Sequence, residues 1–230
     1  MVVILDIETI AHPIAADFVP APDLGSIQAA GNLKDPEKIA ASIAERKAAA
    51  VSAHAVSIGR AALDWNLNRV VAIGTHLQEQ DEPTVALCQT EAAEVKAIES
   101  LWRVTKASTF VGFNLRSFDL PVLIQRSRLL GIQTPKISLA PFGRSNDLID
   151  VYDELTFHNN RGAGIMPQSL KVFARRFGLP VSDPTSGKDI AQLVTDGDWE
   201  GVRSHCLSDV DLTRELAVRI GLVKPWARVA

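Results

Sequence analysis

Two carboxylates stand one residue apart at the end of an apolar segment near the start of the chain. Asp6 and Glu8 follow residues 2–5, whose sequence is VVIL. Side chains alternate between the two faces of a β-strand, so we expect both carboxylates on the same face. Two like charges on a buried face are unfavourable unless something neutralises them, and carboxylate oxygens suit Mg²⁺ or Mn²⁺. A strand that simply continues into a polar loop would give the same pair, so the rest of the chain must decide.

A second acidic position lies in residues 111–121, whose sequence is VGFNLRSFDLP. Gly112 permits close backbone approach at the end of a predicted strand, and Asn114 follows it. Asp119 falls in the first turn of the next predicted helix, where the helix dipole favours a negative charge. The alternative is purely structural, because Asp is common in first turns and Asn is common in loops.

A third position combines an imidazole with a carboxylate. His205 and Asp209 are four residues apart in a long predicted helix, so they lie on one face of it. Asp209 falls at the edge of the apolar face of that helix, which is unusual for an unpaired charge. A surface His–carboxylate pair is the alternative. The apolar face is predicted from Trp199, Val202, Cys206, Val210, Thr213, Leu216 and Ile220.

The remaining sequence predicts the elements that must position these side chains. Strands are expected at residues 1–8, 69–76, 84–88 and 109–113, with the second and third joined as a hairpin. Helices are expected at residues 35–51, 90–104, 118–130, 169–177 and 198–220, the first with Asp35 as N-cap and Pro36 after it. Residues 11–34 show no clear period. This order predicts a mixed α/β sheet, and without a repeat or linker we expect one domain over residues 1–230.

Composition excludes several classes of protein. The chain has 230 residues, of which 47% are hydrophobic and 22% charged, as expected of a soluble globular protein. No apolar run approaches the ~20 residues that cross a membrane, and the start lacks the features of a signal peptide. Cys88 and Cys206 form neither a zinc pattern nor a disulfide framework. We therefore expect a cytoplasmic protein with no membrane partner.

Charge is unevenly distributed although the net charge is only −3. Residues 116–176 contain nine Lys/Arg and five Asp/Glu. A basic segment beside a carboxylate cluster could hold a phosphate backbone, with Arg116, Arg144 and Lys171 as candidate contacts. A solvated surface with scattered charge is the alternative.

The order of the three acidic positions resembles that of the DEDD superfamily of 3′–5′ exonucleases. More narrowly, the chain is similar to the stand-alone predicted exonucleases related to the proofreading domain of B-family DNA polymerases. The resemblance extends to residues 35–39, 70–74, 147–150 and 169–170, the last leading to FGLP at 177–180. It implies an RNase H-like exonuclease fold, with a mixed sheet of five to six strands flanked by helices.

The resemblance also implies a role for each carboxylate. Asp6 would bridge two divalent cations, Mg²⁺ or Mn²⁺, and Glu8 and Asp209 would complete the first site. Asp119 would serve the second cation. In such sites two ions stabilise the attacking and the leaving oxygen of an in-line displacement. His205 would orient or deprotonate the attacking water.

His205 departs from the pattern of the superfamily. One branch has Tyr four residues before the last Asp, and the other has His five residues before it. Here a histidine stands at the tyrosine spacing, and the residue five after it, Val210, cannot bind a metal. The other motifs favour the tyrosine branch with a substitution. A histidine can act as general base, but it is shorter than tyrosine.

Substrate contacts are expected around the first two motifs, from Thr9, Ile10, Asn114, Arg116 and Phe118. Phe118, like Phe113, could instead belong to the core. Asp147 and Asp150 are expected in a loop or at a helix start.

The predicted function is a metal-dependent 3′–5′ exonuclease that releases nucleoside monophosphates from single-stranded DNA. The alternatives are an exoribonuclease of the same superfamily and a catalytically impaired nucleic-acid-binding module. The sequence does not indicate an oligomeric state.

Overall fold

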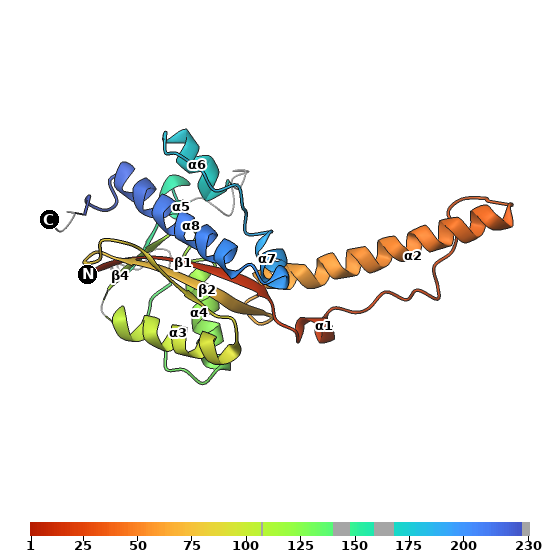
Figure 1. Ribbon diagram of the computed structural model, residues 1–230, viewed down its shortest axis with the longest axis horizontal. Helices are drawn as coiled ribbons and strands as arrows, with labels where there is room; N and C mark the ends of the chain where they lie inside the picture. The colour runs from red at the N-terminus through yellow and green to blue at the C-terminus, as the bar shows by residue number, and fades with distance from the viewer. Residues whose placement is uncertain (107, 140–147, 159–167, 227–230) are drawn as a thin grey trace. The chain divides into compact units, whose positions relative to one another are not determined.

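The computed structural model describes residues 1–106, 108–139, 148–158 and 168–226 (Figure 1). Internal contacts divide the chain into two compact units, one formed by Met1–Thr9 with the chain from Val70 onward and the other by Ile10–Arg69. The expectation of a single exonuclease domain over residues 1–230 stays a prediction.

The larger unit is built on a mixed five-stranded sheet with the strand order β3-β2-β1-β4-β5. β1 pairs in parallel with β4 and β4 with β5, whereas β2 and β3 form the predicted antiparallel hairpin. This arrangement confirms the α/β prediction and agrees with the RNase H-like fold. The strands are β1 Val2–Ala11, β2 Asn68–Leu77, β3 Thr84–Leu87, β4 Thr109–Gly112 and β5 Leu148–Asp150.

Helices cover both faces of this sheet (Figure 1). Helices α3 and α4 share one buried apolar cluster with the sheet, and α5, α6 and α8 share a second on the opposite face. Burial of apolar surface on both faces is the main force that holds the layers together. The helices of this unit are α3 Glu91–Val104, α4 Asp119–Leu129, α5 Val151–Leu155, α6 Leu170–Arg176, α7 Ile190–Asp196 and α8 Trp199–Arg219.

Strand β1 contributes to both clusters by alternation. Val3, Leu5 and Ile7 belong to the cluster beneath α3 and α4, whereas Ile4 belongs to the cluster beneath α8. Asp6 and Glu8 follow Ile4 at intervals of two, so they share its face. The buried strand therefore directs both carboxylates towards α8.

Local signals correctly predicted most of these elements and their ends. The Thr90 side chain caps α3 and the Asp198 side chain caps α8 through bonds to backbone N–H groups of the first turn. The helices α5 and α7 and the strand β5 were not predicted as elements, although Asp150, which precedes α5, was expected in a loop or at a helix start. They contain five, seven and three residues, too few to establish a period.

The smaller unit contains α1 (Ala15–Phe18), α2 (Pro36–Gly59) and a 3-10 turn, η1 (Arg60–Leu63). The Asp35 side chain accepts a hydrogen bond from the Glu37 N–H, which confirms the predicted start of α2. The helix continues beyond Val51, where we expected it to end, because the following residues lack a strong helix breaker before Gly59. No residue of α2 is buried. Among the described residues, no helix is both long and apolar enough to span a membrane.

Candidate active site

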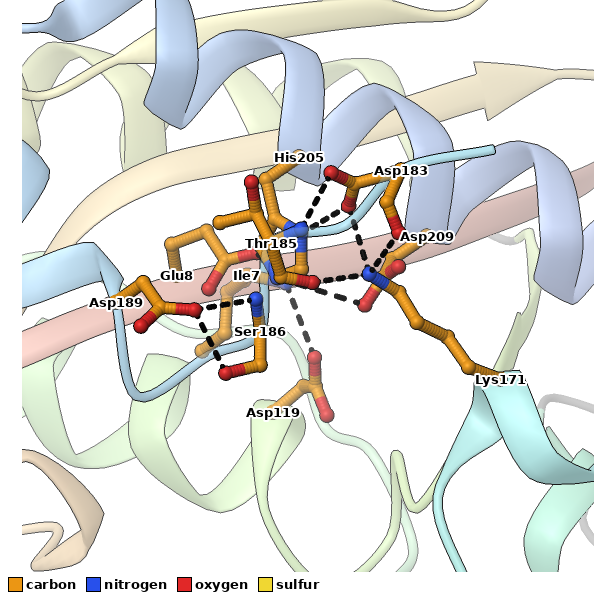
Figure 2. A network of polar contacts seen from close by, with 10 residues as sticks. All are labelled: Ile7, Glu8, Asp119, Lys171, Asp183, Thr185, Ser186, Asp189, His205 and Asp209. Atoms are coloured by element: carbon orange, nitrogen blue, oxygen red, sulfur yellow. Dashed lines mark hydrogen bonds and ion pairs between the residues drawn. The ribbon is translucent and has the colours of Figure 1, made fainter. Parts of the chain in front are cut away.

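Four carboxylates from three elements gather around β1. Asp6 and Glu8 come from the middle of β1, Asp119 from the first residue of α4, and Asp209 from α8. Figure 2 shows Glu8, Asp119 and Asp209 around Ile7. The charge of Asp209 acts on each of the other three carboxylates. The structure therefore brings together the four carboxylates that the sequence suggested.

A backbone hydrogen bond ties the start of α4 to β1. Asp119 Oδ1 accepts from the N–H of Ile7 at 3.1 Å, and Ile7 lies between Asp6 and Glu8 (Figure 2). Asp119 is buried, with 4% of its surface exposed. The helix start thus holds its carboxylate beside the other two.

Close approach of α8 to the sheet depends on Gly74 of β2. A Cβ atom at this position would lie 2.7 Å from both Cys206 Sγ and Val210 Cγ2. Only a residue without a side chain lets these two α8 residues sit so close to the strand. The packing places His205 and Asp209, on the same helix, next to β1.

The loop that leads to Asp119 is organised by Asp150. Asp150 Oδ1 accepts from the N–H groups of Asn114 and Tyr152, both at 3.0 Å, and Oδ2 accepts from the N–H of Arg116 at 2.8 Å. Asp150 also caps α5, which confirms the helix-start interpretation, while Asp147 lies outside the described residues. Asn114 adopts φ 60°, a left-handed conformation that Asn tolerates better than most residues.

Gly112 contributes as predicted. A Cβ atom there would lie 2.8 Å from the carbonyl oxygen of Leu5. The end of β4 therefore approaches β1 where only glycine fits.

Burial, followed by neighbouring charges, raises the pKa values of the four carboxylates. Burial is the largest cause of a raised pKa for Asp6 and Glu8, and the charge of Asp209 and Asp119 adds to it in both. Burial, with the charges of Asp150 and Asp209, raises the pKa of Asp119 to about 8. Burial also raises the pKa of Asp209, although His205 and Lys171 oppose the shift. Without a cation, the cluster therefore retains protons above the usual range of carboxylates.

The donor atoms fit a divalent cation. Asp6 Oδ2 and Asp209 Oδ1 are buried and have no hydrogen-bond partner in the described part of the chain, although buried oxygens almost always have one. Two sets of donor atoms each lie within 4.8 Å of one another, Asp6 with Glu8 and Cys206, and Glu8 with His205 and Asp209. Carboxylate oxygens suit Mg²⁺ and Mn²⁺, and a cation would supply the missing partners.

His205 is buried at the cluster and is not part of a surface pair. Only 3% of its side chain is exposed, and its Nε2 lies 3.5 Å from Glu8 Oε1 and 3.8 Å from Asp209 Oδ2. Its Nδ1 lies 2.6 Å from Asp183 Oδ2 (Figure 2). The two ring nitrogens thus have different surroundings, one facing the cluster and the other a carboxylate outside it.

Asp183 is the site residue that sequence reasoning missed. It lies in the loop between α6 and α7, and Lys171 Nζ donates to its Oδ2 at 2.8 Å and to its carbonyl at 3.0 Å. Burial alone would raise the pKa of Asp183, but hydrogen bonds from Lys171 and His205 hold it below its ordinary value. No periodicity or spacing in the loop sequence links Asp183 to His205, so only the structure could find it.

The predicted substrate contacts have varied surroundings. Thr9 is buried and Ile10 partly exposed on β1. Arg116 Nε pairs with Asp153 Oδ2 at 2.9 Å. Phe118 precedes α4 and packs partly buried against the α3/α4 cluster.

Phe113 belongs to the core, with its ring centroid 5.2 Å from that of Tyr152 and 6.0 Å from that of Phe173. Lys171 differs from our expectation of a phosphate contact. Its ammonium group has three acceptors, two on Asp183 and the carbonyl oxygen of Thr185, and these match its three donors. Arg144 lies outside the described residues.

The comparison with protein families agrees with this geometry. Residues 61–224 match the model of a family described as predicted 3′–5′ exonucleases related to the exonuclease domain of PolB. No curated protein matches the chain. The matched region includes Asp119, His205 and Asp209, while Asp6 and Glu8 precede it on the strand that the structure places beside them. The chain belongs to this family of predicted 3′–5′ exonucleases.

Proposed function

We propose that the protein hydrolyses phosphodiester bonds at the 3′ end of single-stranded DNA and releases nucleoside monophosphates. The observation that carries the proposal is the convergence of Asp6, Glu8, Asp119 and Asp209, in which Asp6 Oδ2 and Asp209 Oδ1 are buried without a hydrogen-bond partner among the described residues. The relation of the family to the exonuclease domain of PolB supports a 3′ end as the substrate and DNA as its nucleic acid. Two free, buried cysteines suit the reducing conditions of the cytoplasm, where we place this activity.

The four carboxylates would hold two divalent cations, Mg²⁺ or Mn²⁺. Asp6 would contribute to both sites, Glu8 and Asp209 to the first, and Asp119 to the second. When bound, such ions neutralise the anionic phosphodiester and stabilise the attacking and the leaving oxygen.

The other residues would position the substrate and the water. His205 Nε2 faces Glu8 and Asp209, so it is the ring nitrogen that can accept a proton from an attacking water or orient it. Thr9 and Ile10 continue β1 beyond Glu8 and would contact the terminal nucleotide. Asn114, Arg116 and Phe118 lead up to Asp119 and would line the approach to it.

A gel assay with a 5′-labelled oligonucleotide tests the proposal. Wild-type protein should shorten single-stranded DNA from the 3′ end with Mn²⁺ or Mg²⁺ and not with EDTA. Asp6→Asn should be at least about 100-fold slower, because it removes the carboxylate assigned to both cations. Asp211→Asn is the matched control on the same helix as Asp209, and we expect it to retain activity.

Each other outcome has a defined meaning. Equal rates for wild type and Asp6→Asn would contradict the proposed site. Degradation of a matched RNA but not of DNA would favour the exoribonuclease alternative. Metal-independent binding of the oligonucleotide without any shortening would favour a catalytically impaired nucleic-acid-binding module.

A further inference from the structure

The contact between Asp183 and His205 has a feature that the proposed chemistry does not by itself require. The imidazole has two nitrogens, and only one of them faces the carboxylate cluster. His205 Nδ1 lies 2.6 Å from Asp183 Oδ2, just below the range of about 2.7–2.9 Å for a charge-assisted N–H···O hydrogen bond. An ionised carboxylate only accepts hydrogen bonds, so Nδ1 must be the donor and carry a proton.

The other ring nitrogen, Nε2, then faces the carboxylate cluster. Nε2 lies between Glu8 and Asp209, at 3.5 Å and 3.8 Å from their oxygens. When the ring is neutral and Nδ1 carries its proton, Nε2 has a free lone pair that can accept a proton or hold a water. The hydrogen bond made by one nitrogen therefore decides what the other can do.

Asp183 is itself held in one orientation. Its Oδ1 accepts from the N–H of Thr185 at 2.9 Å, and its Oδ2 accepts from Lys171 Nζ at 2.8 Å (Figure 2). Lys171 also donates to the carbonyl oxygens of Asp183 and Thr185, so the α6 side chain fixes both ends of this short loop segment. With both oxygens bonded, the carboxylate cannot rotate away from the imidazole without losing these partners.

The loop has a second set of bonds that does not involve His205. Asp189 Oδ2 accepts from Ser186 N at 2.8 Å and from Ser186 Oγ at 2.9 Å. Asp189 therefore is a carboxylate in the same loop that bonds Ser186 but makes no hydrogen bond to the His205 ring. Its substitution is a matched control for substitution of Asp183.

We propose that Asp183, held by Lys171, is a positioning residue that fixes the tautomer and orientation of His205 so that Nε2 faces the carboxylate cluster. The catalytic part of this inference rests on the proposed exonuclease function. The positioning part rests on geometry alone and can be tested in the metal-free protein.

Nuclear magnetic resonance of the full chain, labelled with ¹⁵N-histidine and kept in EDTA, tests the positioning. The His205 signals are identified by their loss in His205→Gln. We expect a proton on Nδ1 in wild type and in Asp189→Ala, and its loss or transfer to Nε2 in Asp183→Ala, which removes the acceptor. A wild-type His205 without a proton on Nδ1, or an unchanged Nδ1 proton in folded Asp183→Ala, would overturn the proposal.

A double-mutant cycle tests the consequence for catalysis. Asp183→Ala should lower kcat by about 10- to 100-fold with little change in KM, by analogy with residues that orient a catalytic or metal-bound histidine. In the His205→Ala background, the same substitution should have no further effect on the residual rate. An equal loss in both backgrounds would mean that Asp183 supports the loop and not the ring, which would contradict the proposal.

These readouts separate the two levels of inference. Wild-type protein that shortens neither DNA nor RNA would end the proposed function and, with it, the catalytic role of Asp183. The Nδ1 proton in the metal-free protein would still decide whether Asp183 positions His205.

Discussion

Buried carboxylates occur in two regions of the molecule, and the two regions differ in whether a basic residue of the chain neutralises them. On the α3/α4 face, Glu94 accepts from Arg126 Nε at 2.7 Å and from Nη2 at 2.9 Å, and also from the N–H of Val70 at 3.0 Å. Both side chains are almost fully buried. The charge of Glu94 is thus neutralised by a residue of the chain itself.

The cluster of Asp6, Glu8, Asp119 and Asp209 has a surplus of negative charge. Among the described residues, no arginine or lysine forms an ion pair with these four carboxylates, although the charge of Lys171 acts on Glu8 and Asp209 and His205 Nε2 lies 3.5 Å and 3.8 Å from their oxygens. Within the described part of the chain, two of the carboxylate oxygens have no hydrogen-bond partner. A buried carboxylate alone is therefore a poor marker of function, and the informative feature is a buried carboxylate without a counter-ion from its own chain.

Breaking the Glu94–Arg126 ion pair should give the largest change in stability. Arg126→Met would leave Glu94 buried without its partner and should lower the free energy of unfolding by about 3–5 kcal/mol, as measured by urea denaturation. The exposed Arg128→Met on the same helix is the control and should change stability by less than about 0.5 kcal/mol. The double variant Glu94→Leu/Arg126→Met should recover much of the loss, and a similar loss in the double variant would show that packing matters more than charge.

Removing a charge from the carboxylate cluster should increase stability, whereas removing Arg126 should decrease it. Asp119→Asn removes a charge but keeps an oxygen that can accept from the Ile7 N–H, so in EDTA at about pH 9 it should stabilise the protein by about 1 kcal/mol or more. Thermal unfolding of both proteins checks this. Destabilisation by Asp119→Asn under these conditions would contradict the electrostatic account of the cluster.

The pH dependence of stability follows from the raised pKa of Asp119. The folded protein holds the Asp119 proton up to a pKa of about 8, whereas the unfolded chain releases it near the ordinary value of 3.8. The contribution of this group to stability is therefore greatest below that ordinary value and falls as the pH rises towards 8. In EDTA, the stability of wild type should fall as the pH rises from the ordinary carboxylate pKa towards 8, and Asp119→Asn should make this fall smaller. Mn²⁺ should also make the fall in wild-type stability smaller, because it neutralises the charges.

Sequence reasoning found those parts of the site that local periodicity determines. Alternation along β1 correctly predicted that Asp6 and Glu8 share a face, and helical spacing correctly placed Asp209 at the edge of a buried face. The N-cap of α2 was also predicted, because a cap depends on residues close in sequence.

Features that depend on distant partners were not predictable in this way. The Asp183–His205 contact joins a loop to a helix 22 residues away, and Asp150 organises a loop 34 to 36 residues before it. Lys171 looked like a phosphate contact because its charge is visible in the sequence, whereas the oxygens that surround it are not. The three residues of β5 are too few for a pattern, and their pairing with β4 defines them as a strand.

The most direct test of this account is a calorimetric titration of the metal-free protein with Mn²⁺ at about pH 8, where cation binding should release protons from the cluster. We predict binding by wild type and by Asp211→Asn, and much weaker binding by Asp6→Asn. Folded wild-type protein that does not bind Mn²⁺, or that binds it no more tightly than Asp6→Asn does, would contradict the claim that these four carboxylates form a divalent cation site.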